Sequence, residues 1–344
     1  MKKLILMFLL GILIFPLIST AGSLELVGAG ATFPYPLYSK MFDEYYKEFG
    51  TKVNYQAIGS GGGIRQLQEM TVDFGATDAF MSDEEVKTKD GNEIIHIPMC
   101  LGAVVITYRL PGNPKIKLDG ETIALIFLGK IVNWNDERIQ KQNPDIKLPE
   151  KNIIVVHRSD GSGTTFIFSD YLSKVNSVWK EKVGTGKSLN WPVGLGAKGN
   201  SGVAGIIQQT PYSIGYVELI YAENNGMPVA EIKNKSGNYI MPSIKSVSAS
   251  ANVKLPEHSR VSLTDTDAED GYPLSSFTWI IVYKEQKCLN KSEAKAKELV
   301  KLLKWMISDG QKFAEPLKYA PLSEEALKIA ENLIGSMTYS GKKI

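Results

Sequence analysis

Short apolar runs alternate with longer amphipathic stretches along the first part of the chain. Five such segments follow one another with apolar positions at strand or helix spacing: 24–27, 34–49, 52–57, 64–70 and 74–76. Strands that alternate with helices are typical of α/β proteins with a mostly parallel sheet. The pattern therefore predicts such a sheet for the N-terminal part of the chain.

A second series of the same kind follows. Strand-like apolar runs at 103–108, 153–156 and 214–217 are separated by helical segments such as 123–128. Because the rhythm of strands and helices is repeated, we expect a second lobe of similar type.

The last third of the chain changes character. Residues 233–270 are rich in Ser, Asn, Asp and Lys with weak periodicity, and we expect irregular surface structure of the second lobe there. Two amphipathic helices are then predicted at 292–308 and 323–337, each opened by a serine in a capping position. We expect these helices to pack back on the first lobe.

The N-terminus has the pattern of a secretory signal peptide. Lys2 and Lys3 precede an apolar stretch at 4–18, and small residues follow up to Ala21. The apolar stretch is interrupted by Pro16 and is shorter than the roughly 20 residues that a membrane-spanning helix needs. We therefore expect cleavage after Ala21 and a soluble protein in the periplasm, rather than a membrane anchor.

Chain length and net charge limit the number of lobes and the kinds of ligand that can be expected. Cleavage would leave about 320 residues, more than the roughly 250–300 at which single hydrophobic cores stop growing, so two lobes are expected. Lys and Arg number 39 against 37 Asp and Glu, and Lys2 and Lys3 account for the difference. A formally neutral mature chain disfavours broad attraction to nucleic acid. An anionic ligand would need a local, directional site.

The two cysteines raise the question of a disulfide. Cys100 precedes the run at 103–108, and Cys288 follows another apolar run at 277–283. Antiparallel pairing of these runs would bring the cysteines together, and an oxidising compartment permits a bridge. Two separate buried thiols are the alternative, and the sequence leaves both open.

Three glycine-rich or hydroxyl-rich turns each connect a predicted strand to the helix that follows it. They lie at 28–34, 59–63 and 158–165. Such turns expose backbone N–H groups near a helix N-terminus, which is how proteins hold small oxyanions. The first presents Thr32 and Phe33, the second presents Ser60, and the third adds the fixed positive charge of Arg158. Glycine before a helix is common, so each turn alone also has a plain structural explanation.

Two other glycine patterns resemble nucleotide-binding motifs but depart from them. The pair Gly28 and Gly30 resembles the start of a dinucleotide fingerprint, but Phe33 stands where its third glycine belongs. Residues 186–188 resemble the end of a phosphate-binding P-loop, but Glu181 replaces the glycine that should open it. Neither pattern predicts a nucleotide cofactor.

A secreted hydrolase is the rival from another class of function. The sequence has no Gly-x-Ser-x-Gly elbow, and His96, His157 and His258 show no metal-ligand spacing. We expect no catalytic residue, no cofactor and no metal.

Four motifs can be compared with known families: GAGATFP at 28–34, NYQ at 54–56, VDFGATD at 72–78 and DGSGT at 160–164. Together they resemble the periplasmic phosphate-binding proteins of phosphate-specific ABC transporters. The likeness runs through essentially the whole mature chain. Further stretches agree in order, at 128–131, 183–186, 199–200 and 214–218.

The resemblance implies an α/β, two-lobed periplasmic binding protein fold of a type II-like kind, with a ligand cleft between the lobes. Lobe I would comprise 22–100 and 276–344, and lobe II would comprise 101–275. The implied function is to bind inorganic phosphate and to deliver it to the permease subunits and, through them, the ATPase subunits of an importer. We expect a monomer without enzymatic activity. Another oxyanion, such as sulfate, molybdate or tungstate, is the alternative ligand.

The resemblance also implies a phosphate site shared by both lobes. Its residues would be Ala31, Thr32, Phe33, Ser60 and Asp78 from lobe I, and Arg158, Asp160, Ser162, Gly163 and Thr164 from lobe II. Asp160 would orient Arg158. The family often has two serines after Gly59, whereas here Gly61 follows Ser60, which is a departure beside the site.

Asp78 has a distinct predicted role. Near neutral pH phosphate still carries a proton and sulfate does not. We predict that Asp78 is ionised and accepts a hydrogen bond from the phosphate O–H, which is open only to a protonated oxyanion. The alternative is that Asp78 merely caps a helix opening at Ser82 or Asp83.

Overall fold

The computed structural model describes residues 24–88 and 92–344. The expected signal peptide and its cleavage site after Ala21 lie outside these residues. Within the described part of the chain, the helices are too short or too polar to cross a bilayer.

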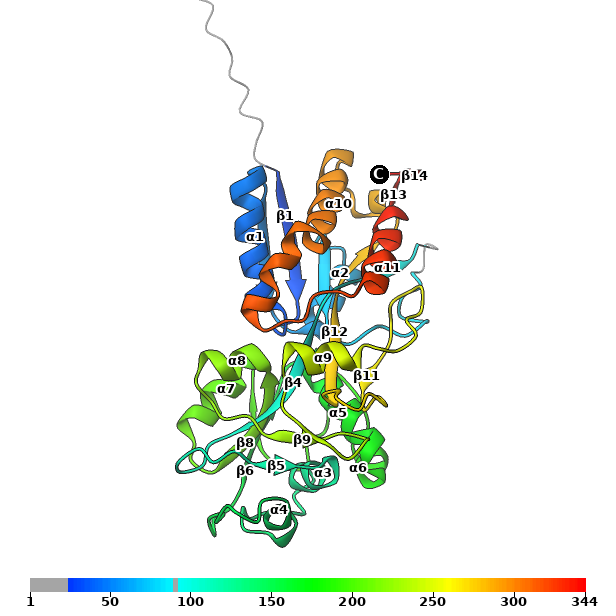
Figure 1. The fold of residues 1–344 in the computed structure, drawn as a ribbon. Helices are drawn as coiled ribbons and strands as arrows, with labels where there is room; N and C mark the ends of the chain where they lie inside the picture. Colours follow the sequence, from blue (N-terminus) through cyan, green and yellow to red (C-terminus); the bar gives the residue numbers. More distant parts are fainter. Residues whose placement is uncertain (1–23, 89–91) are drawn as a thin grey trace, which may run out of the picture.

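A mixed nine-stranded sheet runs through the whole molecule (Figure 1). The strands are β1 (Glu25–Gly30), β2 (Lys52–Ala57), β3 (Phe74–Thr77), β4 (Ile94–Tyr108), β6 (Ile154–Arg158), β7 (Leu195–Ala197), β8 (Ser213–Glu218), β11 (Leu263–Thr264) and β12 (Leu274–Tyr283). Their order is β2-β1-β3-β12-β4-β8-β6-β7, with β11 paired to β12. Two parallel groups, β2-β1-β3 and β8-β6-β7, confirm the two predicted α/β series.

Two long strands connect the halves. Every residue of β4 and β12 is buried, and the two strands pair antiparallel. The first part of β4 pairs with β12, and its last residues pair with β8. In Figure 1 the helices gather into two groups, one around each end of these strands. The chain therefore has the two-lobed α/β fold that the sequence predicted.

Helices cover the sheet in both lobes. Those of the half that holds β1 are α1 (Tyr35–Phe49), α2 (Ser60–Gln68), α10 (Glu293–Ile307) and α11 (Glu324–Gly335). Those of the other half are α3 (Gly120–Phe127), α4 (Glu137–Gln142), α5 (Gly163–Val175), α6 (Ser177–Lys182), α7 (Gly199–Gln209), α8 (Leu219–Asn224) and α9 (Ile244–Ser250). Shorter elements are β5 (Lys117–Leu118), β9 (Glu231–Lys233), β10 (Tyr239–Ile240), β13 (Thr338–Tyr339), β14 (Lys342–Lys343), η1 (Gln286–Leu289), η2 (Asp309–Phe313) and η3 (Glu315–Leu317).

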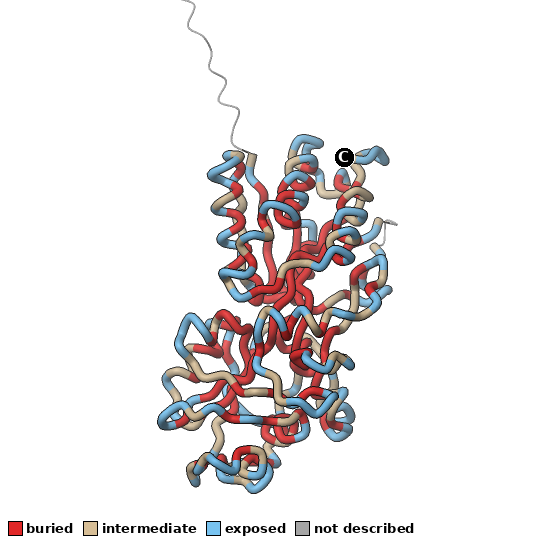
Figure 2. Tube along the Cα trace, viewed as in Figure 1, coloured by how far each residue is buried: buried red, intermediate tan, exposed pale blue. Residues whose placement is uncertain are grey.

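The C-terminal helices are placed as predicted. Ser292 and Ser323 each accept a hydrogen bond from the backbone of the first helical turn, so both cap their helices. The side chain of Glu298 in α10 accepts from the Tyr45 hydroxyl of α1 at 2.8 Å. Buried residues follow the sheet without a break from one half to the other, as Figure 2 shows.

The segment 233–270 is more ordered than predicted. It contains the helix α9, whose start is fixed by a capping box between Ser243 and Ser246. The helix has seven residues, too few for a clear apolar period, and this is why the composition suggested only irregular structure.

Gly28 and Gly30 lie in β1 rather than in a turn, which corrects the prediction. Gly28 pairs with Phe74 of β3, and a Cβ at Gly28 would lie 2.2 Å from the Phe74 ring. These glycines are therefore explained by close packing inside the sheet. Only the residues after Gly30 form the turn into α1.

The structure also places the two cysteines apart. β4 and β12 pair antiparallel as expected, but the register sets Cys100 opposite Thr278 and Tyr283 opposite Ile94. Cys288 lies beyond that end of the pairing, so Cys100 and Cys288 are not joined in a disulfide. Pairing of the two strands did not bring the cysteines together, because β4 begins at Ile94, well before the run at 103–108 that the sequence suggested.

Candidate functional site

The three predicted turns meet where the two lobes contact each other. The backbone N–H of Gly61 donates to the carbonyl of Gly161 at 2.8 Å, and the N–H of Gly163 donates to the Ser60 hydroxyl at 3.1 Å. The first turn joins them through Thr32, whose hydroxyl accepts from Asn200 of α7 at 3.0 Å. Segments that are far apart in the sequence thus form one polar centre.

Two of these turns are themselves helix N-termini, which corrects the predicted boundaries. α2 begins at Ser60 instead of near residue 64, and α5 begins at Gly163 instead of near residue 166. Ser162 caps α5 by accepting from the Thr165 N–H at 3.0 Å. The first N–H groups of a helix have no carbonyl partner within their own helix, and the helix dipole is positive at that end. Both features favour an anion at this centre.

Arg158 ends β6 and is almost entirely buried, with a side chain 1% exposed. Its Nε and Nη2 donate to the two carboxylate oxygens of Asp160 at 2.7 and 2.6 Å, and its Nη1 donates to the Thr164 hydroxyl at 3.2 Å. A guanidinium has five N–H donors, so this fork leaves about two for a ligand. Burial alone would raise the pKa of Asp160, but the hydrogen bonds and charge of Arg158 hold it below its ordinary value. The pair is therefore fixed and ionised.

Asp78 follows β3 and is 2% exposed. Its Oδ1 accepts from the Thr278 hydroxyl at 2.8 Å, and its Oδ2 lies 3.3 Å from the Ser60 hydroxyl. Burial raises the pKa of Asp78 to about 7, although the hydrogen bonds from Thr278 and Ser60 and the charge of Arg158 act in the opposite direction. The Asp78 side chain bonds to residues of β12 and α2, so the alternative of a simple helix cap is not supported.

The turn after β1 is held by tyrosines. The Tyr221 hydroxyl of α8 donates to the Thr32 carbonyl at 2.6 Å, and the Tyr319 hydroxyl donates to the Phe33 carbonyl at 2.7 Å. In a trans peptide the N–H points away from the carbonyl of the same unit. Tyr221 therefore fixes the direction of the Phe33 N–H. The N–H of Ala31, in contrast, already donates to the Ala76 carbonyl at 2.9 Å, so Ala31 positions the turn.

Sequence reasoning missed four residues of this centre. Asn200 donates to the hydroxyls of Thr32 and Thr164 at 3.0 and 3.2 Å, so it connects the lobes. Tyr221, Tyr319 and Thr278 are the other three. Asn200 belongs to a stretch that carried the family resemblance and could have been included, whereas Thr278 lies in a buried strand, and its contact with Asp78 depends on a partner 200 residues away in the sequence.

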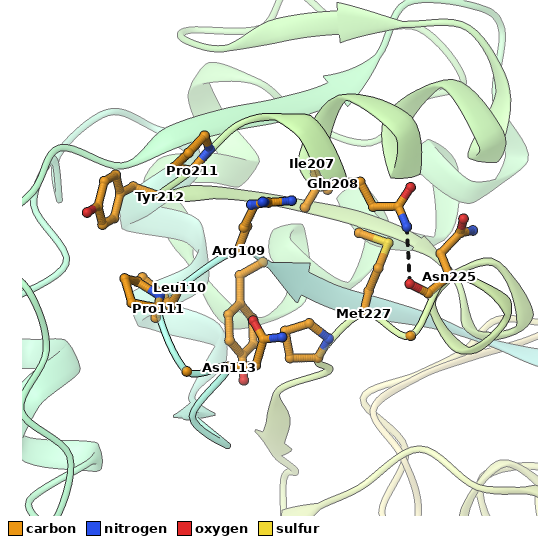
Figure 3. Close-up of a pocket in the computed structure, with 14 residues that line it drawn as sticks. Arg109, Leu110, Pro111, Asn113, Ile207, Gln208, Pro211, Tyr212, Asn225 and Met227 are labelled. Carbon is orange, nitrogen blue, oxygen red and sulfur yellow. Dashed lines mark hydrogen bonds between the residues drawn. The ribbon is translucent and has the colours of Figure 1, made fainter.

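Two of the cavities in the structure lie in different places, one beside the polar centre and the other away from it. One, of about 310 Å³, opens at the edge of the polar centre and is lined by Thr32, Asp160, Gly199 and Tyr221 among others. Another, of about 490 Å³, lies beyond the end of β4 and is shown in Figure 3. Its labelled side chains include Arg109 and Met227, and the residues that line it include none of those predicted for the anion site.

Comparison with known proteins places the chain in a family. The model of the PBP superfamily domain matches residues 18–310. The phosphate-binding protein PstS of Pasteurella multocida is 42% identical over 93% of this chain and 92% of its own length. The chain belongs to the PstS family of phosphate-binding proteins. The PstS protein of Haemophilus influenzae is also 42% identical, over 88% of this chain and 90% of its own.

The fold is shared with a more distant protein of known structure. A phosphate ABC transporter substrate-binding protein from Clostridium perfringens, solved with bound phosphate, covers 87% of this chain and 100% of its own with a TM-score of 0.63. The sequences are 16% identical, so this likeness concerns the architecture.

Proposed function

We propose that this protein binds inorganic phosphate in the periplasm and delivers it to an ABC importer. One observation carries the proposal. Two helix N-termini, a buried Arg158 and a buried Asp78 converge at one point between the lobes. Relatives at 42% identity are named phosphate-binding proteins, which supports the same ligand here.

The proposed site replaces the water shell of phosphate with directional donors. These come from the residues Thr32, Phe33, Ser60, Arg158, Ser162 and Thr164, while Ala31, Asp160 and Gly163 hold others in place, since the Gly163 N–H already donates to the Ser60 hydroxyl. A hydrogen bond to a charged group contributes about 1.5–3 kcal/mol, and micromolar affinity needs only about 8.2 kcal/mol. A few such bonds are therefore sufficient, because donors on helix ends lose little freedom when the ligand binds.

Domain boundaries fit the same proposal. Lobe I would comprise 22–100 and 276–344, and lobe II 101–275, so that β4 and β12 form the connection. Ser60 and Gly163 then belong to different lobes, and their contact closes the cleft. Binding and closure become one event that the permease subunits can recognise.

The role is transport and not catalysis, and the protein acts as a secreted monomer. Membership of the PstS family supports the transport role, because the curated relatives are named as binding proteins. Sustained hydrolysis of an aryl phosphate by the purified protein would contradict the proposal and favour a secreted phosphoester hydrolase.

Calorimetric titration with phosphate and with sulfate tests the ligand. We expect phosphate to bind at micromolar concentration or below, and sulfate to bind on the order of a thousandfold more weakly near pH 8 because of the Asp78 charge. Tighter binding of sulfate, molybdate or tungstate than of phosphate would assign a different oxyanion.

Substitution of Gly163 by alanine tests closure. A Cβ at Gly163 would lie 2.5 Å from both the Asp78 Oδ2 and the Ser60 Oγ. Overpacking of this kind costs about 1–3 kcal/mol, so we expect phosphate affinity to fall by about 5- to 150-fold. The measurement is calorimetry.

Gly205→Ala in α7 is the matched control, because nothing lies within 4 Å of its Cβ position. We expect unchanged affinity and a slight gain in thermal stability. Equal affinities of the Gly163 and Gly205 variants would contradict closure at this point.

A further inference from the structure

Glu218 is a buried carboxyl that the proposed phosphate site does not use. It ends β8 and is fully buried. Its Oε2 accepts from the N–H of Ile220 at 2.9 Å, which caps α8. Its Oε1 has no hydrogen-bond partner among residues 24–88 and 92–344. A buried carboxylate with one bare oxygen would be costly, so the charge state of Glu218 needs an explanation.

Tyr319 connects Glu218 to the turn that holds Phe33. Its hydroxyl oxygen lies 2.7 Å from the Phe33 carbonyl and 3.3 Å from the Glu218 Oε2. The adjoining residue Ala320 pairs with Leu101 of β4, so the tyrosine stands where the chain crosses between the lobes. The contact therefore spans the C-terminal segment, β8 and the first turn.

Counting hydrogens assigns the proton. A tyrosine hydroxyl has one hydrogen, and the Phe33 carbonyl can only accept, so at 2.7 Å that hydrogen belongs to the Tyr319–Phe33 bond. The remaining contact, from Tyr319 to the Glu218 Oε2, then needs a hydrogen from Glu218. A carboxylate would instead place two acceptors opposite each other. The Tyr319 contact is satisfied when Glu218 is a neutral acid that donates to Tyr319, and the bare Oε1 is then an uncharged carbonyl oxygen instead of part of a buried carboxylate.

The surroundings favour the neutral form as well. Burial raises the pKa of Glu218 well above its ordinary value and outweighs the hydrogen bonds from Ile220, Tyr319 and Leu219, which act in the opposite direction, while the charge of Asp78 adds to the effect of burial. The other titratable groups that face it are Cys100, Tyr221 and Tyr319, whose ionised forms are also anionic. No ion pair reaches Glu218 within the part of the chain that the structure describes.

We propose that Glu218 is a neutral positioning residue whose hydrogen bond to Tyr319 holds the Phe33 turn and latches the lobes together around phosphate. The proposal rests on the function inferred above. The Glu218 N–H also donates to Asn200 Oδ1 at 3.0 Å, and Asn200 donates to Thr32. Glu218 is therefore joined to the binding turn at two successive residues, while adding no negative charge near an anionic ligand.

Calorimetric titrations with phosphate, on variants that lack the Tyr319 hydroxyl or the Glu218 carboxyl group, test this proposal. We expect Tyr319→Phe and Glu218→Ala each to weaken phosphate binding about tenfold, the equivalent of one hydrogen bond. Because Glu218 acts on the Phe33 turn through Tyr319, which also loses its own bond to Phe33 in Tyr319→Phe, the double variant should bind no more weakly than Tyr319→Phe. Glu218→Gln keeps the neutral charge and one of the two contacts, so we expect it to stay within about threefold of the wild type.

Tyr272→Phe is the matched control. The Tyr272 hydroxyl is equally buried and also donates to a main-chain carbonyl, that of Val104 at 3.1 Å, but both residues belong to the segment proposed as lobe II. We expect this variant to melt at a lower temperature with unchanged phosphate affinity. Equal affinities of Tyr319→Phe and Tyr272→Phe, or additive losses in the double variant, would overturn the latch.

A readout without ligand separates this proposal from the proposed function. At pH 7 we expect infrared spectra of the wild type to contain the carbonyl band of a neutral carboxylic acid that Glu218→Gln removes. Absence of that band would overturn the neutral assignment, whether or not phosphate binds. Failure of the wild type to bind phosphate, with the band present, would instead contradict only the proposed function and the latch's role in it.

Discussion

Replacing Arg158 by alanine is expected to weaken phosphate binding by at least a hundredfold. The variant loses the two N–H donors that remain after the fork with Asp160 and the bond to Thr164. Each charge-assisted bond contributes about 1.5–3 kcal/mol, and about 1.4 kcal/mol corresponds to a factor of ten. Calorimetry at matched ionic strength measures the loss, and a melting curve records the state of the fold.

Arg158→Ala also leaves the Asp160 carboxylate buried without its ion-pair partner, so the experiment needs a control for the loss of stability that this causes. Removing one member of a buried pair costs about 3–5 kcal/mol of stability. The double variant Arg158→Ala with Asp160→Asn removes that charge and should recover stability but not affinity. If the double variant binds phosphate as the wild type does, Arg158 acts only by neutralising Asp160 and is not a ligand.

Arg158→Lys completes the series. Lysine keeps the positive charge but presents a single ammonium group in place of a planar fork, so it cannot hold Asp160 and a ligand together in the same way. We expect its affinity to lie between those of the wild type and Arg158→Ala. Wild-type affinity in this variant would show that charge matters and the fork does not.

Much of the fold follows from local patterns in the sequence. The serines at 292 and 323 cap the helices that the apolar period predicted, because a hydroxyl beside free N–H groups is a local signal. The run at 52–57 became β2 with the same limits. Such features depend on neighbours in the chain, and a single sequence contains them.

Features that depend on distant partners could not be read in this way. Gly28 and Gly30 look like a turn until Phe74 and β3 are placed against them. The position of Cys288 relative to Cys100 depends on the register of two long strands, and because both are buried on both faces, no alternation of apolar and polar residues fixes that register. The same limit hid Thr278, which reaches Asp78 from a strand 200 residues away in sequence.

The candidate site combines both kinds of information. Its turns were predicted because helix N-termini and glycines have a local signature. For Asp78 the sequence predicted an ionised carboxylate but not the raised pKa, since that depends on burial in the folded protein. Asp160 is held ionised by Arg158, whereas Asp78 has a raised pKa because its burial outweighs its hydrogen bonds. The two carboxyl groups in this site therefore differ in pKa, and only Asp78 changes its protonation state near neutral pH.

Discrimination between phosphate and sulfate is expected to increase as pH rises through about 7. The raised pKa of Asp78 means that its neutral form persists up to about pH 7 and its ionised form dominates above that value. The neutral carboxyl can donate to an oxygen of sulfate, whereas the carboxylate can only accept, which suits the remaining proton of phosphate. Two like charges a few Å apart cost on the order of 4 kcal/mol at an effective dielectric constant near 20, or on the order of a thousandfold in affinity. Parallel titrations with both ions at pH 5.5 and pH 8 measure the ratio.

Asp78→Asn separates this cause from any titration of the ligands themselves. The amide can donate at every pH, so sulfate should bind more tightly than to the wild type at pH 8, and the ratio of affinities should become nearly independent of Asp78 titration. In the native protein the Asp78 carboxylate accepts a hydrogen bond from the Thr278 hydroxyl at 2.8 Å. The Asn side chain keeps an oxygen that can accept this bond, so the fold should be preserved. A wild-type ratio that stays constant from pH 5.5 to pH 8, or an equal ratio in Asp78→Asn, would mean that the carboxyl proton plays no part in selection. Under that outcome the preference for phosphate would have to come from the neutral donors and Arg158, which present the same hydrogens to either anion. Because those donors do not distinguish the two ligands, a change of ratio with pH that disappears in Asp78→Asn can come only from the proton at Asp78.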